Sequence, residues 1–220
     1  MDYQIPIDPI GAVQVTTPPS SEPISLAEAK AHLRVDTADE DPLIQNLIAA
    51  AREACEEWCG RSFVTQTLTL TLDRFPSPSL TAPGPETAWS GSFRNDGTIE
   101  LPRPPAISLT SITYIDTNGA SQTLSSSGYK LDLASQPARL APAFGTSWPA
   151  TRDEIASVVI VYSAGYGAAS AVPARAKAAI LLLLGTLYEN REDAVVGSIV
   201  SRLPLGVMDL LGSIRVPSLP

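Results

Sequence analysis

The chain has 220 residues, of which 44% are hydrophobic and 17% charged, so it can bury a substantial core and does not belong to the class of disordered proteins. Its 23 acidic and 15 basic residues give a formal net charge of −8, the wrong sign for a protein that grips DNA by neutralising phosphates. Two cysteines and one histidine cannot supply the four ligands of a Cys/His zinc site. We therefore expect a folded protein without a metal or another cofactor.

Residues 1–23 are rich in proline and show no apolar periodicity. They lack the basic start and the apolar core of a secretory signal peptide, so we expect the chain to be made and kept in the cytoplasm. Because such a segment has nothing of its own to bury, it favours an extended arm that becomes ordered against a partner.

Two helices are predicted after this arm. Ser25 and Glu28 have the spacing of a capping box, in which each side chain accepts a hydrogen bond from the other residue's free backbone N–H. One face of this helix carries Leu26, Ala29 and Leu33. The acidic run 39–41 with Pro42 predicts a second helix start, and Gly60 predicts its end. Apolar residues recur there at spacings of three and four: Leu43, Leu47, Ala51, Ala54, Cys55 and Trp58.

Cys55 and Cys59 are four residues apart, so they share one face of the second predicted helix. Side chains along one helical turn are not oriented for a disulfide bond. We interpret both cysteines as small buried hydrophobic residues in a reducing compartment.

The apolar period changes from helical to two at Phe63, which predicts entry into a β-sheet. The apolar residues of this stretch are Val64, Leu68, Leu70 and Leu72. Threonines alternate with them, as is typical of a half-buried strand. Residues 76–97 are rich in proline, serine and glycine and are expected to form a long exposed loop.

Three further strands are predicted over residues 107–115, 129–133 and 155–162. Asn118 and Gly119 favour the positive φ of a tight hairpin turn. The sequence therefore predicts a β-rich insertion between two helical segments.

A third helix is predicted to begin at Pro173, where a missing N–H costs little, and its apolar stripe extends most of the way round. A helix this apolar needs cover on several sides, from its own bundle or from neighbouring subunits. Its longest apolar run is about half of the ~20 residues that a bilayer requires, so no membrane span is predicted. A short segment over residues 205–214 and a tail over residues 215–220 follow.

These patterns predict an α+β fold, with a bundle of about four helices interrupted by a β-rich insertion and extended N- and C-terminal arms. The expected parts are an N-terminal arm (residues 1–23), a helical core in two pieces (24–62 and 164–214), a β-rich insertion (63–163) and a C-terminal tail (215–220).

Motifs of common enzyme chemistry are missing: the sequence holds no G-x-x-x-x-G-K-[ST], no G-x-G-x-x-G and no G-x-S-x-G. His32 has no Ser or Cys nucleophile near it in sequence, so we assign it a structural or surface role. The acid pairs Glu56 with Glu57 and Asp153 with Glu154 are interpreted as solvated faces, because adjacent helical residues point in different directions. No catalytic residues are predicted.

Four aromatic residues lie in or beside glycine-rich or proline-rich loops: Trp89, Phe93, Trp148 and Tyr166. Rings in this position more often pin a loop to its sheet than bind a ligand. The alternative is a carbohydrate-binding or hydrolytic module, for which the candidate set is Glu86, Trp89, Phe93 and Asp96.

Five stretches of the sequence, in order from residue 24 to residue 215, are similar to the head-to-tail connector (adaptor) family of long-tailed phages and gene transfer agents. The first two are ISLAEAKAHLRVD and DEDPLIQNLIAAAREACEEWCGRSFVTQT. The middle adds YIDTNG, YKLDL and VIVYSAGYG, and the end adds VPARAKAAILLLLGTLYENRE and PLGVMDLLGSIR.

This resemblance implies a non-enzymatic subunit of a ring, usually of twelve copies, that lies in the neck of the particle after assembly in the bacterial cytoplasm. The ring would contact the portal protein on one side and a stopper or other neck protein on the other. DNA would only pass through its lumen. Another neck protein, such as a stopper or tail terminator, is the alternative within this class.

The third helix and the C-terminal segment carry surplus apolar surface, so we expect contacts with other subunits and with the portal there. The candidate residues are Ile180, Leu183, Leu184, Leu187, Tyr188, Leu205, Leu210, Leu211, Ile214 and Arg215.

Overall fold

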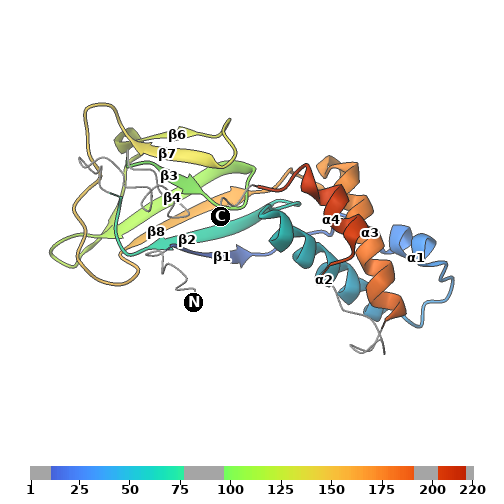
Figure 1. The fold of residues 1–220 in the computed structure, drawn as a ribbon. Helices are drawn as coiled ribbons and strands as arrows, with labels where there is room; N and C mark the ends of the chain where they lie inside the picture. The colour runs from blue at the N-terminus through green and yellow to red at the C-terminus, as the bar shows by residue number, and fades with distance from the viewer. Residues whose placement is uncertain (1–10, 77–96, 191–202, 217–220) are drawn as a thin grey trace, which may run out of the picture. The chain divides into compact units, whose positions relative to one another are not determined.

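The structure is a computed structural model that describes residues 11–76, 97–190 and 203–216. It divides into two compact units, each assembled from separate stretches of the chain. The helical unit comprises residues 19–65 and 166–216, and the β unit comprises residues 11–18 and 66–165 of the described chain. Figure 1 shows helices in the first unit and strands in the second, so the predicted α+β class is confirmed.

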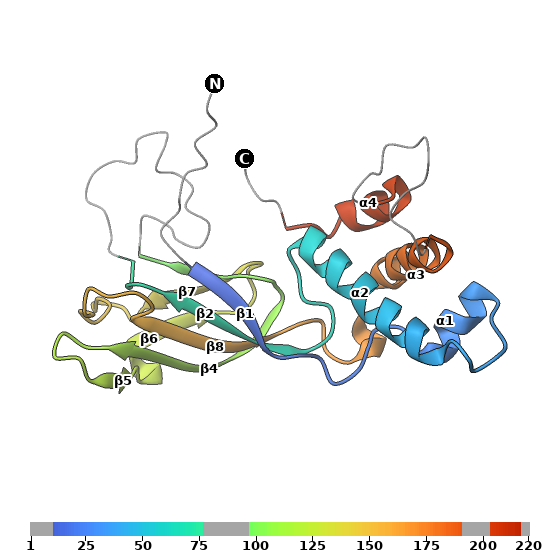
Figure 2. The ribbon, with the colours of Figure 1, turned by 90° about the horizontal axis from the view of Figure 1, so that it is seen from below.

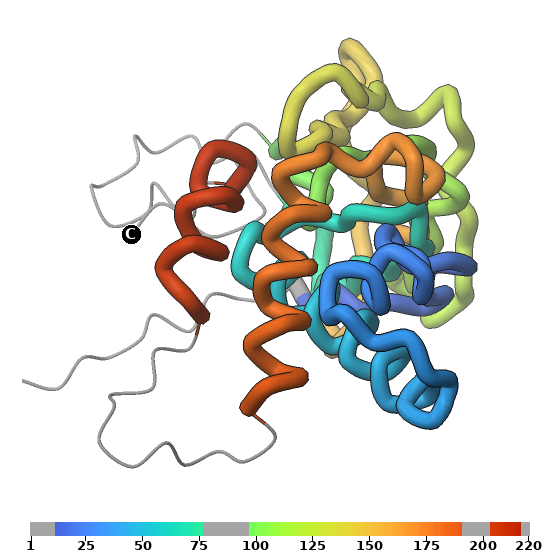
Figure 3. Tube along the Cα trace, turned by 90° about the vertical axis from the view of Figure 1, so that its right-hand side faces the viewer, coloured from blue at the N-terminus to red at the C-terminus, as the bar shows by residue number. Residues whose placement is uncertain are grey.

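Four α-helices form the helical unit within the described residues: α1 (Leu26–Leu33), α2 (Asp41–Cys59), α3 (Ala174–Glu189) and α4 (Leu205–Gly212). Helix α3 contacts each of the other three helices. Figure 3 shows α3 and α4 side by side, and the short 3-10 helix η2 (Ala169–Ala171) precedes α3. A single apolar core therefore gathers around α3.

The predicted helix boundaries have the expected local causes. Ser25 caps α1: its hydroxyl accepts a hydrogen bond from the Glu28 N–H at 3.2 Å, and the Glu28 carboxylate accepts one from the Ser25 N–H at 2.8 Å. Gly60 ends α2 with a φ of 65°, a left-handed conformation that glycine adopts without strain. The capping box and both ends of α2 are confirmed.

The buried face of α2 differs from the predicted one. Its buried apolar residues are Ile44, Ile48, Ala51, Cys55 and Cys59, whereas Leu43, Leu47, Ala54 and Trp58 are only partly buried. Apolar residues stand in adjacent pairs along this helix, so two neighbouring stripes satisfy the same spacing of three and four. Packing against the other helices selects the isoleucine stripe.

The β unit contains two antiparallel sheets within the described residues. The five-stranded sheet has the order β1-β2-β8-β4-β5, and the three-stranded sheet has the order β3-β7-β6. The strands are β1 (Gly11–Thr17), β2 (Gln66–Leu72), β3 (Ile99–Leu101), β4 (Ala106–Ile115), β5 (Ser121–Thr123), β6 (Tyr129–Asp132), β7 (Ala138–Pro142) and β8 (Val158–Ala164). The 3-10 helix η1 (Ser126–Gly128) precedes β6.

One core fills the β unit and draws side chains from both sheets. Burial alternates along β2 and β8, as their period of two requires. The other sheet contributes Ile99, Leu101, Ala138 and Leu140. Tyr162 is fully buried and its hydroxyl donates a hydrogen bond to the Pro102 carbonyl at 2.7 Å, so the one polar atom of this large side chain is satisfied.

The predicted strands are present with shifted ends. The first begins at Gln66, because Phe63 and Val64 are buried in the helical core instead, and the last begins at Val158 rather than residue 155. The hairpin turn at Asn118 and Gly119 is confirmed, with a φ of 85° at Gly119. The predicted loop over residues 76–97 lies outside the described residues except at its two ends.

The N-terminal segment contains a strand that the sequence analysis did not predict. Residues 11–17 form β1 and pair with β2 from Gly11 opposite Leu72 to Thr17 opposite Thr67. This part of the expected arm therefore has a partner within its own chain. Residues 1–10 lie outside the described residues.

Candidate interaction surfaces

The described residues contain no group of three or more His, Cys, Asp and Glu side chains that could hold a metal ion. None of the helices in the described ranges is both long and apolar enough to cross a membrane. His32 lies exposed on α1, with its ring facing Gly185 of α3. The candidate carbohydrate set Glu86, Trp89, Phe93 and Asp96 lies outside the described residues.

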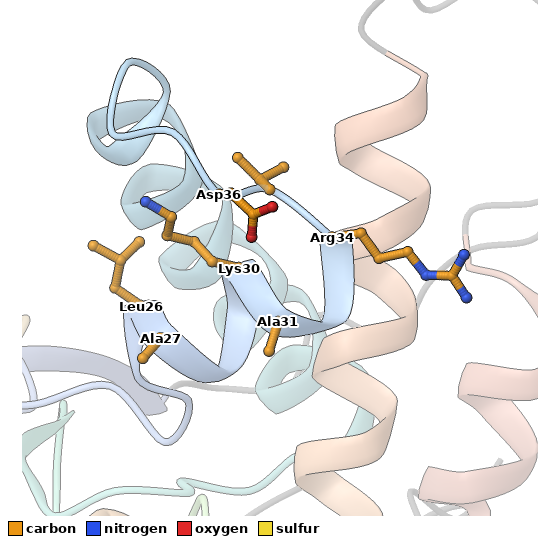
Figure 4. A pocket seen from close by; sticks show the side chains of 7 residues that line it. Leu26, Ala27, Lys30, Ala31, Arg34 and Asp36 are labelled. Atoms are coloured by element: carbon orange, nitrogen blue, oxygen red, sulfur yellow. The ribbon is translucent and has the colours of Figure 1, made fainter.

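A shallow hollow lies on α1 and the turn after it, as Figure 4 shows. It is lined by Leu26, Ala27, Lys30, Ala31, Arg34, Val35 and Asp36. The Lys30 ammonium donates to the Asp41 carboxylate at 2.6 Å and to the Thr37 carbonyl at 2.7 Å, so its charge is already paired. In Figure 4 Arg34 points away from the other lining side chains. The hollow therefore combines four apolar side chains with three charged ones.

A buried ion-pair cluster centres on Arg52 of α2. Its guanidinium donates to Glu56 at 2.9 Å, to Glu22 at 2.8 Å and to Glu53 at 3.1 Å. Arg52 is 5% exposed and Glu56 is 1% exposed. Burial alone would lower the pKa of Arg52, but hydrogen bonds and charge from Glu22 and Glu56 raise it. The guanidinium therefore stays charged inside the protein.

The solvated face that we predicted for Glu56 and Glu57 is wrong for Glu56. Glu56 follows Arg52 by four residues, so both side chains lie on one face of α2, and this face is covered. The other Glu56 oxygen accepts a hydrogen bond from the Phe63 N–H at 2.6 Å. Glu57 is exposed as expected, and so are Asp153 and Glu154.

Cys55 and Cys59 are fully buried and free, which confirms that they are buried within the fold. Burial raises the pKa of both thiols to about 12, with a smaller contribution at Cys55 from Cys59 and Glu56. Because the thiolate is the reactive form, both side chains are protected from thiol chemistry while the protein is folded.

One of the four candidate aromatic residues, Trp148, contacts described residues at either end of the predicted loop. Trp148 stacks on Phe75, with ring centroids 4.9 Å apart and planes 6° apart. Its indole N–H donates to the Gly97 carbonyl at 2.7 Å. Trp148 therefore contacts residues at both ends of the segment 76–97. Trp89 and Phe93 lie outside the described residues, and Tyr166 packs against the helical core.

Most of the ten candidate contact residues pack within their own helical unit. Those fully buried in its core are Ile180, Leu183, Leu184 and Leu211. Those partly buried against the same core are Leu187, Tyr188, Leu210 and Ile214. Leu205 stands apart, because 74% of it is exposed. The surplus apolar surface of α3 is therefore largely covered by the chain itself.

The start of the C-terminal tail also packs on its own chain. The Arg215 guanidinium lies 4.8 Å from the centre of the Trp58 ring, a cation–π contact. Arg61 donates a hydrogen bond to the Ile214 carbonyl, and the Val216 N–H donates one to the Cys59 carbonyl at 2.8 Å. The predicted C-terminal arm therefore packs on its own chain up to residue 216.

Two exposed leucines remain on α3 and α4, and we call them the α3–α4 surface: Leu182 and Leu205. Leu182 is 44% exposed, and its Cδ1 atom lies 3.9 Å from where a Cβ would stand on Gly206. Because Gly206 follows Leu205, the two leucines belong to one region. Leu182 was not among the predicted contact residues, because it lies in an apolar stripe that extends most of the way round α3.

Residues 23–131 match the family model described as "Phage gp6-like head-tail connector protein". This range contains α1, α2 and the strands from β2 to most of β6. No curated protein sequence matches the chain.

Solved structures with a similar fold come from particles of gene transfer agents. A chain in the neck of an empty particle, computed with C6 symmetry, aligns with a TM-score of 0.71 and 24% identity over 95% of this chain and 97% of that chain. A chain in a native particle aligns with a TM-score of 0.71 and 22% identity over 94% of this chain and 97% of that chain. A chain in the neck of a native particle, computed with C12 symmetry, aligns with a TM-score of 0.65 and 23% identity over 95% of this chain and 97% of that chain. At these identities the likeness shows a shared fold.

The substitution Arg52→Met tests the buried cluster. It leaves Glu56 charged and buried beside a side chain that cannot neutralise it, so we expect the free energy of unfolding to fall by about 3–5 kcal/mol. Adding Glu56→Gln should recover part of this loss, because the amide keeps an acceptor for the Phe63 N–H without the charge. Urea unfolding of both variants measures the difference, and a double variant less stable than Arg52→Met alone would contradict the assignment.

The thiols provide a second test. At pH 8 neither cysteine of the native protein should react with a thiol-specific disulfide reagent, and both should react after unfolding in urea. The raised pKa also sets a pH dependence: thiols of the unfolded chain ionise near pH 9 and the folded ones near 12. The contribution of the thiols to the free energy of unfolding should therefore be constant well below pH 9 and be lost as the pH rises from 9 toward 12. Rapid labelling of the native protein would show that the thiols are not enclosed.

Proposed function

We propose that this chain, which belongs to the phage gp6-like head-tail connector family, is a structural subunit of the neck that joins the head of a phage-like particle to its tail. The match of residues 23–131 to the family model carries this proposal. Those residues include two helices of the helical unit and most of the five-stranded sheet, so the match covers parts of both units. The role is one of binding and assembly, without a catalytic step.

In finer detail, we propose that about twelve copies form a ring below the portal protein and above a stopper or another neck protein. The number rests on the similarly folded chain in a gene transfer agent neck that was computed with C12 symmetry. DNA would cross the lumen of this ring during packaging and release. The formal charge of −8 favours that role, because a net acidic protein repels phosphates and lets DNA slide past.

Among the apolar candidate contact residues, Leu205 is the most exposed, so it can meet another protein without rearrangement of its own unit. We propose that the α3–α4 surface, Leu182 with Leu205, forms part of the contact with the portal or with a neighbouring subunit. Apolar side chains that are exposed next to one another are candidates for an interaction site. The buried candidates, such as Leu184, act by holding α3 and α4 in place.

Deletion of the gene in the bacterium that produces the particles tests the connector role. We expect heads packed with DNA that carry no tails, because the portal would lack the subunit to which the next neck protein binds. A plasmid copy of the gene should restore tailed particles, as counted by negative-stain electron microscopy. Tailed particles in normal number without the gene would overturn the proposal.

The α3–α4 surface can be tested separately from folding. Leu205→Ser should change the free energy of unfolding by no more than about 0.5 kcal/mol, because the side chain is mostly exposed, yet it should lower the amount of protein incorporated into particles. The matched variant Leu184→Ala empties a buried position in the same unit and should cost about 2–5 kcal/mol. Normal incorporation of the Leu182→Ser/Leu205→Ser protein would remove this surface from the account.

A further inference from the structure

The five-stranded sheet of the β unit has two edges that no other strand in the described ranges covers completely. Strand β1 forms one edge and pairs only with β2. At the other edge β5 pairs with residues 113–115 of β4, and Leu124 donates a hydrogen bond to the Ile112 carbonyl. Residues 106–111 of β4 pair only with β8. Figure 2 shows β1 and β4 toward opposite sides of this sheet.

Neither edge segment contains a charged side chain or a proline, although register shifts against their neighbours mark bulges in both. Natural edge strands are protected by charged side chains or by proline within the strand. Strand β1 reads GAVQVTT, and residues 106–111 of β4 read AISLTS, so both are free of charge and of proline. Their lengths also agree, with seven residues on one edge and six on the other.

Each edge exposes one large aliphatic side chain: Val15 on β1 is 43% exposed and Ile107 on β4 is 42% exposed. Ile107 stands where the register of β4 against β8 skips from Ala106 to Ser108, so it has no partner on β8. A bulge of this kind redirects a side chain and increases the local twist. The two exposed residues would be covered together if the two edges met.

The strand directions allow the two edges to join head to tail. Neighbouring strands from β1 through β2 and β8 to β4 are all antiparallel, so β1 and β4 run in opposite directions. A second copy rotated about an axis along the strands keeps its directions, so its β1 beside the first copy's β4 is antiparallel as well. The same step can be repeated, which is what a cyclic ring requires of two different surfaces on one subunit.

We propose that neighbouring subunits pair edge to edge, with β1 of one copy adding to residues 106–111 of β4 in the next. The occupant of each edge is therefore a second copy of this chain, and the β units form a closed belt of strands. Backbone hydrogen bonds supply affinity, while Val15 and Ile107 lose their exposure to water. This inference rests on the proposed connector ring and specifies one of its contacts.

Cysteine cross-linking tests the pairing in purified particles and in the isolated protein. The variant Val15→Cys/Ile107→Cys carries one new thiol on each edge, and a short thiol-reactive bifunctional reagent should convert it into a ladder of linked multimers. Each single variant alone should give no linked product, and a mixture of the two single variants should stop at dimers. The native Cys55 and Cys59 are fully buried and therefore provide a silent background.

The matched control Val15→Cys/Ile155→Cys places the second thiol on an exposed loop residue of the same unit and should give no ladder. Dimers from a single variant would overturn head-to-tail pairing in favour of like edges. Particles that contain the double variant without any ladder would overturn the inference and leave the connector role intact. Protein that neither enters particles nor forms multimers would overturn both.

A charge placed on the edge gives an independent measurement. Val15→Lys should abolish the multimers seen by native mass spectrometry, while circular dichroism remains that of the folded protein. Ile155→Lys should leave the multimers unchanged. Combining Val15→Lys with Ile107→Glu should restore them in part, because the two new charges would face each other across the contact. Multimers that persist in Val15→Lys would overturn the pairing.

Discussion

The buried guanidinium of Arg52 ties together three stretches of chain that the sequence keeps apart. It holds Glu22 ahead of α1 and Glu56 one turn further along α2, and Glu56 in turn receives the backbone N–H of Phe63. Phe63 is where the chain has left α2 and approaches β2. A buried charge is stable only when its partners are all in place, so this cluster fixes the route of the chain into and out of α2.

The helical unit is built from two distant pieces of the chain, and the Arg52 cluster orders the first of them. Residues 19–65 supply α1 and α2, and residues 166–216 supply α3 and α4. The apolar core around α3 provides most of the driving force, but apolar packing is not directional. The ion-pair cluster, the Ser25 cap and the hydrogen bonds of residues 214–216 to the end of α2 specify which segments meet.

Local patterns in the sequence were sufficient to predict the capped helices, the alternating strands and the hairpin at Gly119, because each depends on residues close together in the chain. They were insufficient where a distant partner decides the outcome. Glu56 is buried only because Arg52 and Phe63 surround it, and β1 is a strand because β2 lies beside it. Strands β3 and β5, with three residues each, are too short for a period of two to be recognised, and β7 was also not predicted.

Local sequence patterns were also insufficient to predict which candidate contact residues are exposed. An apolar count along α3 indicates surplus surface, but it cannot tell which leucines the chain covers itself. Leu184 and Leu211 are enclosed, while Leu182 and Leu205 are exposed. The family match indicates where in a particle the protein would act. The structure adds a short set of exposed residues: two leucines of the helical unit and one aliphatic residue on each edge of the sheet.

Cryo-electron microscopy of purified particles, with this chain fitted to the neck density, tests the connector role most directly. The account predicts a closed ring of copies directly below the portal, around a lumen wide enough for DNA, with the helical unit and the β unit each recognisable in every copy. Neck density that is filled without this chain, or its absence from tailed particles, would contradict the account.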